Sequence, residues 1–300
     1  HHQGAAGDAD ETTGDARDGP IASRLLLGKA LQRIRLEANM SGAEAAKAMG
    51  FGAAKLSKIE RGRAPVTKAD LQRFFHVFDV SEDVRPTLLE LGIQSRRPRR
   101  NRTTTLEQNL PGKNFEKYLG LEEVAVGIKD WHTHLITGLL QTPDYARALI
   151  SVNPLLLPYQ IDALVNLRIE RQKVLHREKE PLHLWAIVEE QALRRVIGTP
   201  EIRDTQLRHL LEMGQKPNIN IQVIPESTGT HPGLDGSFAI LDAGAHLPPV
   251  VYIDSRGMNI YIEGIAELAV YKAAYDQIQS AALSPVQSAE AITMILEESR

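Results

Sequence analysis

Residues 41–63 have the sequence SGAEAAKAMGFGAAKLSKIERGR, which predicts two short helices separated by a tight turn. Ser41 and Glu44 form a capping-box pattern, in which the serine hydroxyl accepts a backbone N–H and the glutamate accepts the N–H of the serine. This first helix should end at Gly50, because glycine adopts positive φ without a steric penalty. A second helix is expected over Ala53–Arg61.

The side chains of this region divide into an apolar face and a polar face. Leu27, Leu31 and Ile34 recur at helical spacing and predict a preceding helix that packs against the pair. The last helix should turn Leu56 and Ile59 inward. Its outer face should then carry Lys55, Ser57, Lys58 and Arg61. Such a helix fits the major groove of DNA, which is about 12 Å wide, although any alanine-rich three-helix bundle shares the pattern.

Charge is unevenly distributed along the chain, whose net charge is −3. Residues 21–102 hold 17 Lys and Arg against 8 Asp and Glu, whereas residues 103–300 hold 17 against 25. A basic segment beside an acidic one is typical of a chain with a polyanionic partner. The chain has no cysteine, which excludes disulfides and thiolate zinc sites and fits a reducing, cytoplasmic location.

Composition divides the chain into four segments. Residues 1–20 lack large apolar side chains and are expected to form a disordered tail. Residues 21–95 are expected to form five short helices, and residues 96–112, with two prolines and five arginines, an Arg-rich linker. Residues 113–300 should form a second, larger domain. No apolar run approaches the roughly 18 residues that span a bilayer, so no membrane segment is expected.

The second domain is predicted to be α+β, with helices and a small, mainly antiparallel sheet. One long amphipathic helix is expected over residues 115–136. Apolar segments and period-two patterns predict strands at 182–188, 218–224, 237–241, 250–254 and 258–262. The chain should end in two helices, the last of them capped by Ser284.

Residues 25–78 resemble the Cro/phage-repressor (XRE) family of helix-turn-helix domains. The resemblance is carried by residues 31–35, Ser41 with Glu44, Ala46, Gly50 and, most of all, residues 55–62. In that family an arginine of the first helix pairs with a glutamate of the last motif. The resemblance therefore implies a structural pair between Arg35 and Glu60.

The same resemblance implies binding to double-stranded DNA. The family often has Gln where this chain has Gly42, and Gln, Ser or Thr where it has Ala53 and Ala54. Alanine offers a base edge only a methyl contact. Base discrimination by one copy should then be modest, and a homodimer would double the site. The candidate DNA-binding residues are Ser41, Gly52, Ala53, Ala54, Lys55, Ser57, Lys58, Arg61 and Arg63.

The arginines of the linker form a candidate arm. They are Arg96, Arg97, Arg99, Arg100 and Arg102. Such an arm can follow the DNA backbone or enter a narrow minor groove, or it can be a solubilising linker.

Residues 113–300 resemble the domain family DUF5753. The runs that carry the resemblance include 118–122, 138–146, 168–172 and 188–194. That domain typically follows an XRE helix-turn-helix in bacterial regulators. It is associated with developmental and antibiotic regulation and with small companion proteins encoded nearby, which implies a companion protein or a small-molecule effector. The charged residues of 168–172 are expected to face water or to form weak pairs.

Three further residues are candidates for binding a ligand or partner. Glu189 and Glu190 follow a buried strand, and His231 lies in the glycine-rich loop 229–236. The structural alternatives are a helix cap and a hairpin connection. No zinc, Walker, GxSxG or GxGxxG pattern is present, so we expect no metal, no cofactor and no enzymatic activity.

These features together predict a sequence-specific DNA-binding transcriptional regulator. It should be cytoplasmic and homodimeric, and its second domain should sense a small ligand or a protein partner. The alternative is an antitoxin-like module that binds a small companion protein, with DNA binding secondary.

Overall fold

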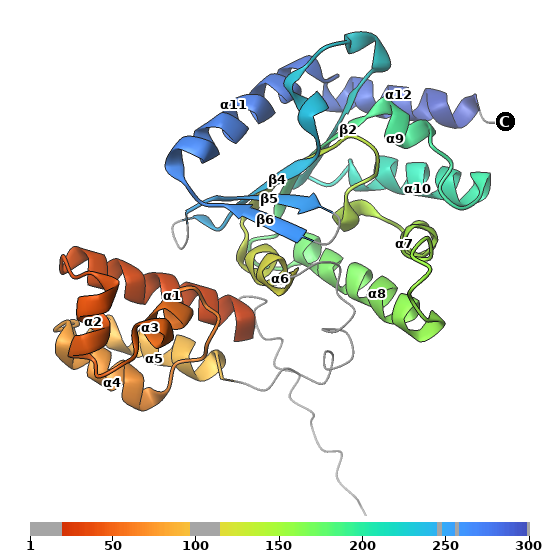
Figure 1. Ribbon diagram of the computed structural model, residues 1–300. Coiled ribbons are helices and arrows are strands. Elements are labelled where there is room, and N and C mark those ends of the chain that lie inside the picture. Colours follow the sequence, from red (N-terminus) through yellow and green to blue (C-terminus); the bar gives the residue numbers. More distant parts are fainter. Residues whose placement is uncertain (1–19, 97–114, 245–247, 256–257, 299–300) are drawn as a thin grey trace, which may run out of the picture.

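The structure is a computed structural model that describes residues 20–96, 115–244, 248–255 and 258–298. Two parts are visible in Figure 1: a head domain of helices, residues 20–96, and a sheet domain, residues 115–298. The predicted tail 1–20 and linker 96–112 lie outside the described residues, apart from Pro20 and Arg96. The predicted α+β fold class, with an all-helical N-terminal part, is confirmed.

The head domain consists of the five helices expected from the sequence. They are α1 (Pro20–Glu37), α2 (Gly42–Ala48), α3 (Ala53–Glu60), α4 (Lys68–Val77) and α5 (Arg85–Gln94). The predicted capping box at Ser41 and Glu44 starts α2, and Gly50 follows it with φ of 66°. Thr67 and Asp70 form a second capping box that starts α4.

Helices α1 and α3 approach each other closely at Gly28. A Cβ atom on this residue would lie 2.5 Å from the carbonyl oxygen of Ile59 and 2.7 Å from that of Glu60. Only glycine therefore lets the backbones meet at this distance. Leu27, Leu31 and Leu56 fill the core beside the crossing and are almost fully buried. The position of α3 is thus fixed by α1.

The sheet domain is built on one six-stranded mixed sheet. Its strands are β1 (Gly127–His132), β2 (His183–Glu189), β3 (Ile219–Ile224), β4 (Phe238–Asp242), β5 (Val250–Ser255) and β6 (Met258–Ile262). Their spatial order is β3-β2-β1-β4-β5-β6. The pairs β1–β4, β4–β5 and β5–β6 are antiparallel, as expected for most of the sheet. The pairs β1–β2 and β2–β3 are parallel.

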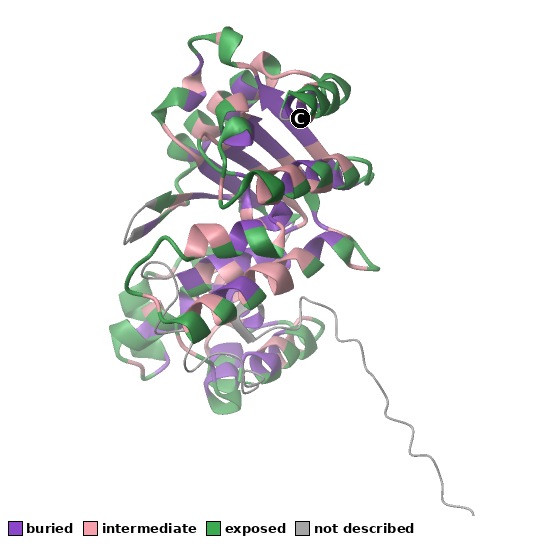
Figure 2. Ribbon diagram, turned by 90° about the vertical axis from the view of Figure 1, so that its right-hand side faces the viewer, coloured by how far each residue is buried: buried purple, intermediate pink, exposed green. Residues whose placement is uncertain are grey.

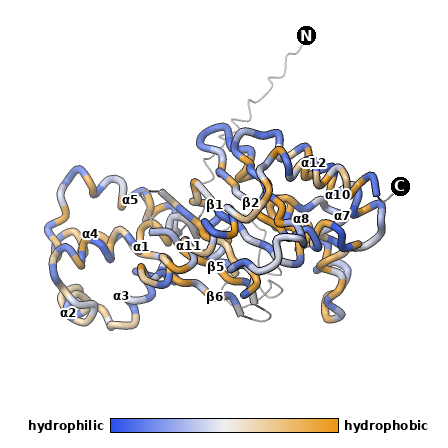
Figure 3. Tube along the Cα trace, turned by 90° about the horizontal axis from the view of Figure 1, so that it is seen from above, coloured by the Kyte–Doolittle hydropathy of each residue, from blue (hydrophilic) through white to orange (hydrophobic). Residues whose placement is uncertain are grey.

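Helices cover both faces of this sheet. They are α6 (Phe115–Val124), α7 (Pro143–Ile150), α8 (Pro158–Arg171), α9 (Glu190–Arg194), α10 (Pro200–Met213), α11 (Ile265–Ala281) and α12 (Pro285–Glu297). One face packs against α6, α10 and α12, and the other against α11. Most strand residues are consequently buried (Figure 2), and apolar segments gather along the strands and the helix sides that meet them (Figure 3).

The prediction of a single helix over residues 115–136 is wrong. Helix α6 ends at Val124, and β1 begins at Gly127 in the centre of the sheet. Ile128 and Trp131 point to opposite faces, and both are buried by helices. Because β1 is covered on both faces, it lacks the alternation of apolar and polar residues that identifies a half-exposed strand.

Helix α1 also connects the head domain to the sheet domain. Leu25 is buried within the main core of the sheet domain, and α1 contacts α6. Lys29 on α1 lies 3.0 Å from Glu263, which also pairs with Lys117 on α6. The helix that positions α3 is therefore the same helix that anchors the head domain to the sheet domain (Figure 1).

Candidate nucleic-acid interface

A buried ion pair holds α3 against α1. Nε and Nη2 of Arg35 donate to the two carboxylate oxygens of Glu60 at 2.6 and 3.0 Å, and Nη1 donates to the carbonyl of Met40 at 2.7 Å. Both side chains are less than 10% exposed. The structure thus brings together the two residues that the resemblance paired, and the hydrogen bonds that Arg35 donates to Glu60 raise the pKa of Arg35.

The outer face of α3 is exposed. Ala53, Ala54, Lys58 and Arg61 are open to solvent, and Ser57 is partly exposed and accepts a hydrogen bond from Arg61. The flanking candidates Ser41, Gly52 and Arg63 are exposed as well. Within the described part of the chain, the side chains of Lys58 and Arg63 have no hydrogen-bond or ion-pair partner, so these two cations are available to an external polyanion.

Lys55 is occupied within the head domain. Its Nζ lies 2.9 Å from Asp70 Oδ1 and 3.9 Å from the ring centroid of Phe51. Asp70 is buried, and burial opposes its ionisation, but the bonds from Lys55 and Thr67 outweigh that effect and lower its pKa. From the sequence, Lys55 was expected to contact bases. Its contact with Asp70, fifteen residues further along the chain, could not be recognised from the sequence. A structural role for Lys55 follows.

Replacing Lys55 with methionine should lower the free energy of unfolding of the head domain by about 1 kcal/mol, since one half-exposed charged hydrogen bond is lost. The difference from wild type should be complete above the ordinary pKa of Asp70, near 3.8. It should decline as the pH falls through the lower native pKa, because the protonated carboxyl no longer attracts a cation. Urea unfolding over a pH series measures this, and a difference that grows on acidification would contradict the assignment.

A concave notch of about 260 Å³ lies beside the exposed face of α3. It is lined by Gln32, Gly42, Ala53, Leu56, Ser57, Glu60 and Arg61. A Cβ atom on Gly42 would meet nothing within 4 Å. The notch therefore adjoins two of the positions at which the family resemblance leads one to expect longer polar side chains. Gln32 lies on α1 among residues 31–35, which carry the family resemblance, but it was not among the candidate DNA-binding residues.

The candidate arm is described only at Arg96. Its Nη1 donates to the carbonyl of Val66 at 3.3 Å, which ties the end of the head domain to the segment before α4. Arg97, Arg99, Arg100 and Arg102 lie outside the described residues.

In the sheet domain, Glu189 and His231 lie together. Nδ1 of His231 accepts the N–H of Gly233 at 3.2 Å, so the ring proton is on Nε2, which donates to Glu189 at 3.0 Å. The ring is buried, with its plane perpendicular to that of Trp131. Glu190 instead accepts from Arg194 and from the N–H of Glu226. These contacts fix the loop that contains His231 against the ends of β1 and β2.

A buried charged cluster was not foreseen from the sequence. Arg171 donates to both carboxylate oxygens of Glu122 at 2.8 Å, and both side chains are nearly inaccessible. Asp130 lies 3.1 Å from His132 and accepts a hydrogen bond from Thr137. Burial opposes both charges of the Asp130–His132 pair, but their mutual attraction prevails, which lowers the pKa of Asp130 and raises that of His132.

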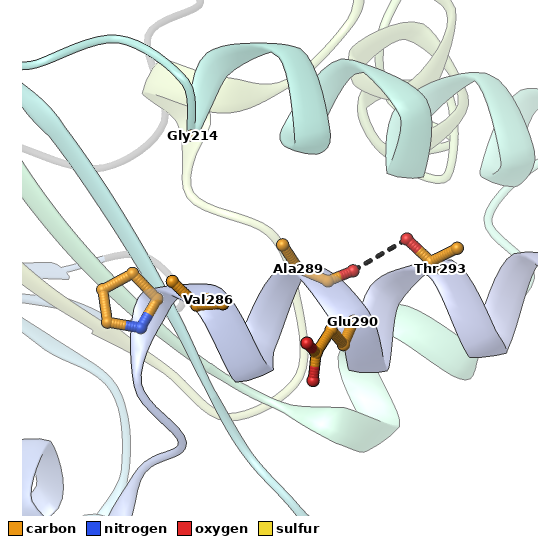
Figure 4. Close-up of a pocket in the computed structure, with 6 residues that line it drawn as sticks. Gly214, Val286, Ala289, Glu290 and Thr293 are labelled. Atoms are coloured by element: carbon orange, nitrogen blue, oxygen red, sulfur yellow. Dashed lines mark hydrogen bonds between the residues drawn. The ribbon is translucent and has the colours of Figure 1, made fainter.

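A shallow groove separates the end of α10 from α12 (Figure 4). Its lining residues are Gly214, Pro285, Val286, Ala289, Glu290 and Thr293. The hydroxyl of Thr293 donates to the carbonyl of Ala289 within α12, as the dashed line in Figure 4 marks. Of the lining side chains, Glu290 alone carries a charge.

Helices α2 and α3, joined through Gly50 and locked onto α1, define a helix-turn-helix domain, and a family model described as a helix-turn-helix domain matches residues 26–88. A second model, a domain of unknown function (DUF5753), matches residues 115–294, and the chain belongs to this family. A search of curated proteins found no match. Among the described residues, no helix is long and apolar enough to cross a membrane, and no three His, Asp or Glu side chains are grouped to hold a metal ion.

Proposed function

We propose that the protein is a sequence-specific DNA-binding transcriptional regulator of the XRE type. The observation that supports this most directly is the outer face of α3, where Lys58, Arg61 and Arg63 are exposed beside a helix that Arg35 and Glu60 lock in place. A rigid helix with exposed cations can enter the major groove and contact both phosphates and base edges.

The rest of the proposal follows the two-domain organisation. A homodimer would present two such helices to half-sites about one helical turn apart. The sheet domain would sense a small ligand or a companion protein, and α1, which contacts both domains, would transmit the change. We further propose a cytoplasmic location and a non-catalytic role.

The DNA-binding proposal is tested with a charge reversal on α3. A duplex selected from a random pool by the wild-type protein should bind Lys58→Glu about fivefold or more weakly, since one good base or phosphate contact contributes about 1–3 kcal/mol. Lys272→Glu on α11 changes the net charge equally on an exposed site of the sheet domain and serves as the control. Equal affinity of the two variants in gel-shift titrations would refute the assignment of α3 as the recognition helix.

The antitoxin-like alternative has one observation in its favour. Ala53 and Ala54 are exposed without polar side chains and Lys55 is bonded to Asp70, so the face offers few groups for base contacts. On this alternative, co-purification from the native host would recover a small protein, and random-pool selection would enrich no sequence.

A further inference from the structure

The carboxyl end of β1 lies where the sheet changes from parallel to antiparallel. Strand β2 is parallel to β1 on one side, and β4 is antiparallel to it on the other. Because β5 is antiparallel to β4, the carboxyl ends of β1 and β5 share one edge of the sheet. In open α/β sheets, ligands bind outside the carboxyl ends of the strands.

Arg168 on α8 reaches the charged cluster at this edge with most of its donors unused. Its Nη1 donates to Gln141 at 2.5 Å. Among the described residues it has no other hydrogen bond and no carboxylate within ion-pair distance, although a guanidinium has five donor hydrogens. Gly138 makes room for it, since a Cβ atom there would lie 3.1 Å from Cδ of Arg168. Burial and the neighbouring Arg171 lower the pKa of Arg168 to about 10.

Asp254, at the end of β5, is the matching unpaired anion. It is exposed, and it forms no ion pair within the described ranges of the chain. The surrounding protein still removes part of the water around its carboxylate. This desolvation raises the pKa of Asp254 and outweighs the attraction of Arg168, His132 and Arg171, which lowers it. The charges of Arg168 and Asp254 therefore attract each other, but no nitrogen of Arg168 lies within 4.0 Å of an Asp254 carboxylate oxygen, so the two form no direct ion pair.

The other charges of the cluster are already neutralised in pairs. Glu122 is bound on both oxygens by Arg171, and Asp130 is bound by His132 and Thr137. One cation and one carboxylate are thus left over at the same edge. A simple anion would satisfy Arg168 but would stand beside Asp254, and a simple amine would meet the reverse conflict.

We propose that Arg168 and Asp254 bind a small zwitterion of the α-amino acid class. Its carboxylate is held by Arg168 beside His132, and its ammonium group is held by Asp254. The ligand forms an ion pair with each of these two charges and acts as the effector of the sheet domain. This inference rests on the sensory role proposed above. Its entry is from the side of Asp254, which is exposed to solvent.

Calorimetric titration of the full chain with each standard α-amino acid tests the site without DNA. We expect at least one to bind, and we expect its decarboxylated amine and its deaminated acid to bind about tenfold or more weakly, because each lacks one charged hydrogen-bonding group. Binding of the acid or the amine as strongly as the amino acid, or no binding by any amino acid, would overturn the proposal.

Variants assign the binding to the two residues. Arg168→Gln and Asp254→Asn should each weaken binding about tenfold or more, whereas Arg147→Gln, an exposed arginine of α7, should not. Asp254 is exposed, so Asp254→Asn tests the site even if Arg168→Gln is poorly folded. Undiminished binding by Asp254→Asn would overturn the assignment.

Gel shifts with and without the bound amino acid separate the site from its regulatory role. A change in DNA affinity that disappears in Asp254→Asn supports both. If the wild-type protein binds no DNA, the proposed function fails, while the calorimetric result for the site remains valid because it involves no DNA.

Discussion

Replacing Glu60 with alanine will lower the free energy of unfolding of the head domain by about 3–5 kcal/mol, because the Arg35 guanidinium is left buried without its counter-charge. The lost contacts are two charged hydrogen bonds of 2.6 and 3.0 Å between side chains only 8% and 7% exposed. A loss of this size approaches the whole stability of many small domains. Amide hydrogen exchange in α1–α3 should therefore rise toward the unfolded rate, and DNA binding should disappear with it.

Two comparison variants isolate the cause. Glu37→Ala removes an exposed carboxylate from the same helix as Arg35 and should change stability by less than about 0.5 kcal/mol. Arg35→Met combined with Glu60→Leu removes both buried charges and should recover most of the lost stability. If Glu60→Ala proved as stable as Glu37→Ala, α3 would be held by the apolar contacts of Leu56 and Ile59 alone.

The head domain could be predicted from the sequence because its signals are local. The capping box at Ser41, the positive φ at Gly50 and the helical spacing of Leu27 and Leu31 each depend on residues within one or two turns. What the sequence could not provide was the pairing of Lys55 with Asp70, because that contact depends on how α4 packs against α3. Lys55 is exposed on the outer face of α3 as expected, and its bond to Asp70 is the feature that the sequence did not show.

The sheet domain was harder to predict because its informative contacts are between distant segments. Residues 127–132, which form β1, were assigned to a helix, so the predicted sheet lacked its central strand. With β1 in place, two helical connections link β1, β2 and β3, and such crossovers produce parallel neighbours. Val124, Val126 and Ile128 around Gly127 were the available β signal.

The charged cluster of the sheet domain illustrates the same limit. Glu122, Asp130 and Arg171 belong to three different elements, and each taken alone has the sequence context of a solvent-facing charge. Burial of such groups depends on partners that only the tertiary fold supplies. The buried pair of Arg171 and Glu122 nevertheless allows a quantitative prediction of stability, because a buried charge that loses its partner is strongly destabilising.

Replacing Arg171 with methionine will therefore destabilise the sheet domain by about 3–5 kcal/mol, since Glu122 is then buried without a cation. Glu122 is 2% exposed, and no bulk water can replace the two 2.8 Å bonds from Arg171. Methionine keeps much of the packing against Phe115 and Tyr118, over whose rings the guanidinium lies, so the charge is the main quantity changed. Both tryptophans, Trp131 and Trp185, lie in this domain, so their fluorescence in urea follows its unfolding.

Lys173→Met, two residues further along the chain, is the matched control. Lys173 is 72% exposed and pairs with Glu170 at the surface, so its loss should change stability by less than about 0.5 kcal/mol. Adding Glu122→Gln to Arg171→Met removes the unpaired charge and should recover part of the stability, because a buried amide is less unfavourable than a buried carboxylate. An Arg171→Met protein that unfolds at the same urea concentration as Lys173→Met would show that Glu122 is accommodated without its arginine.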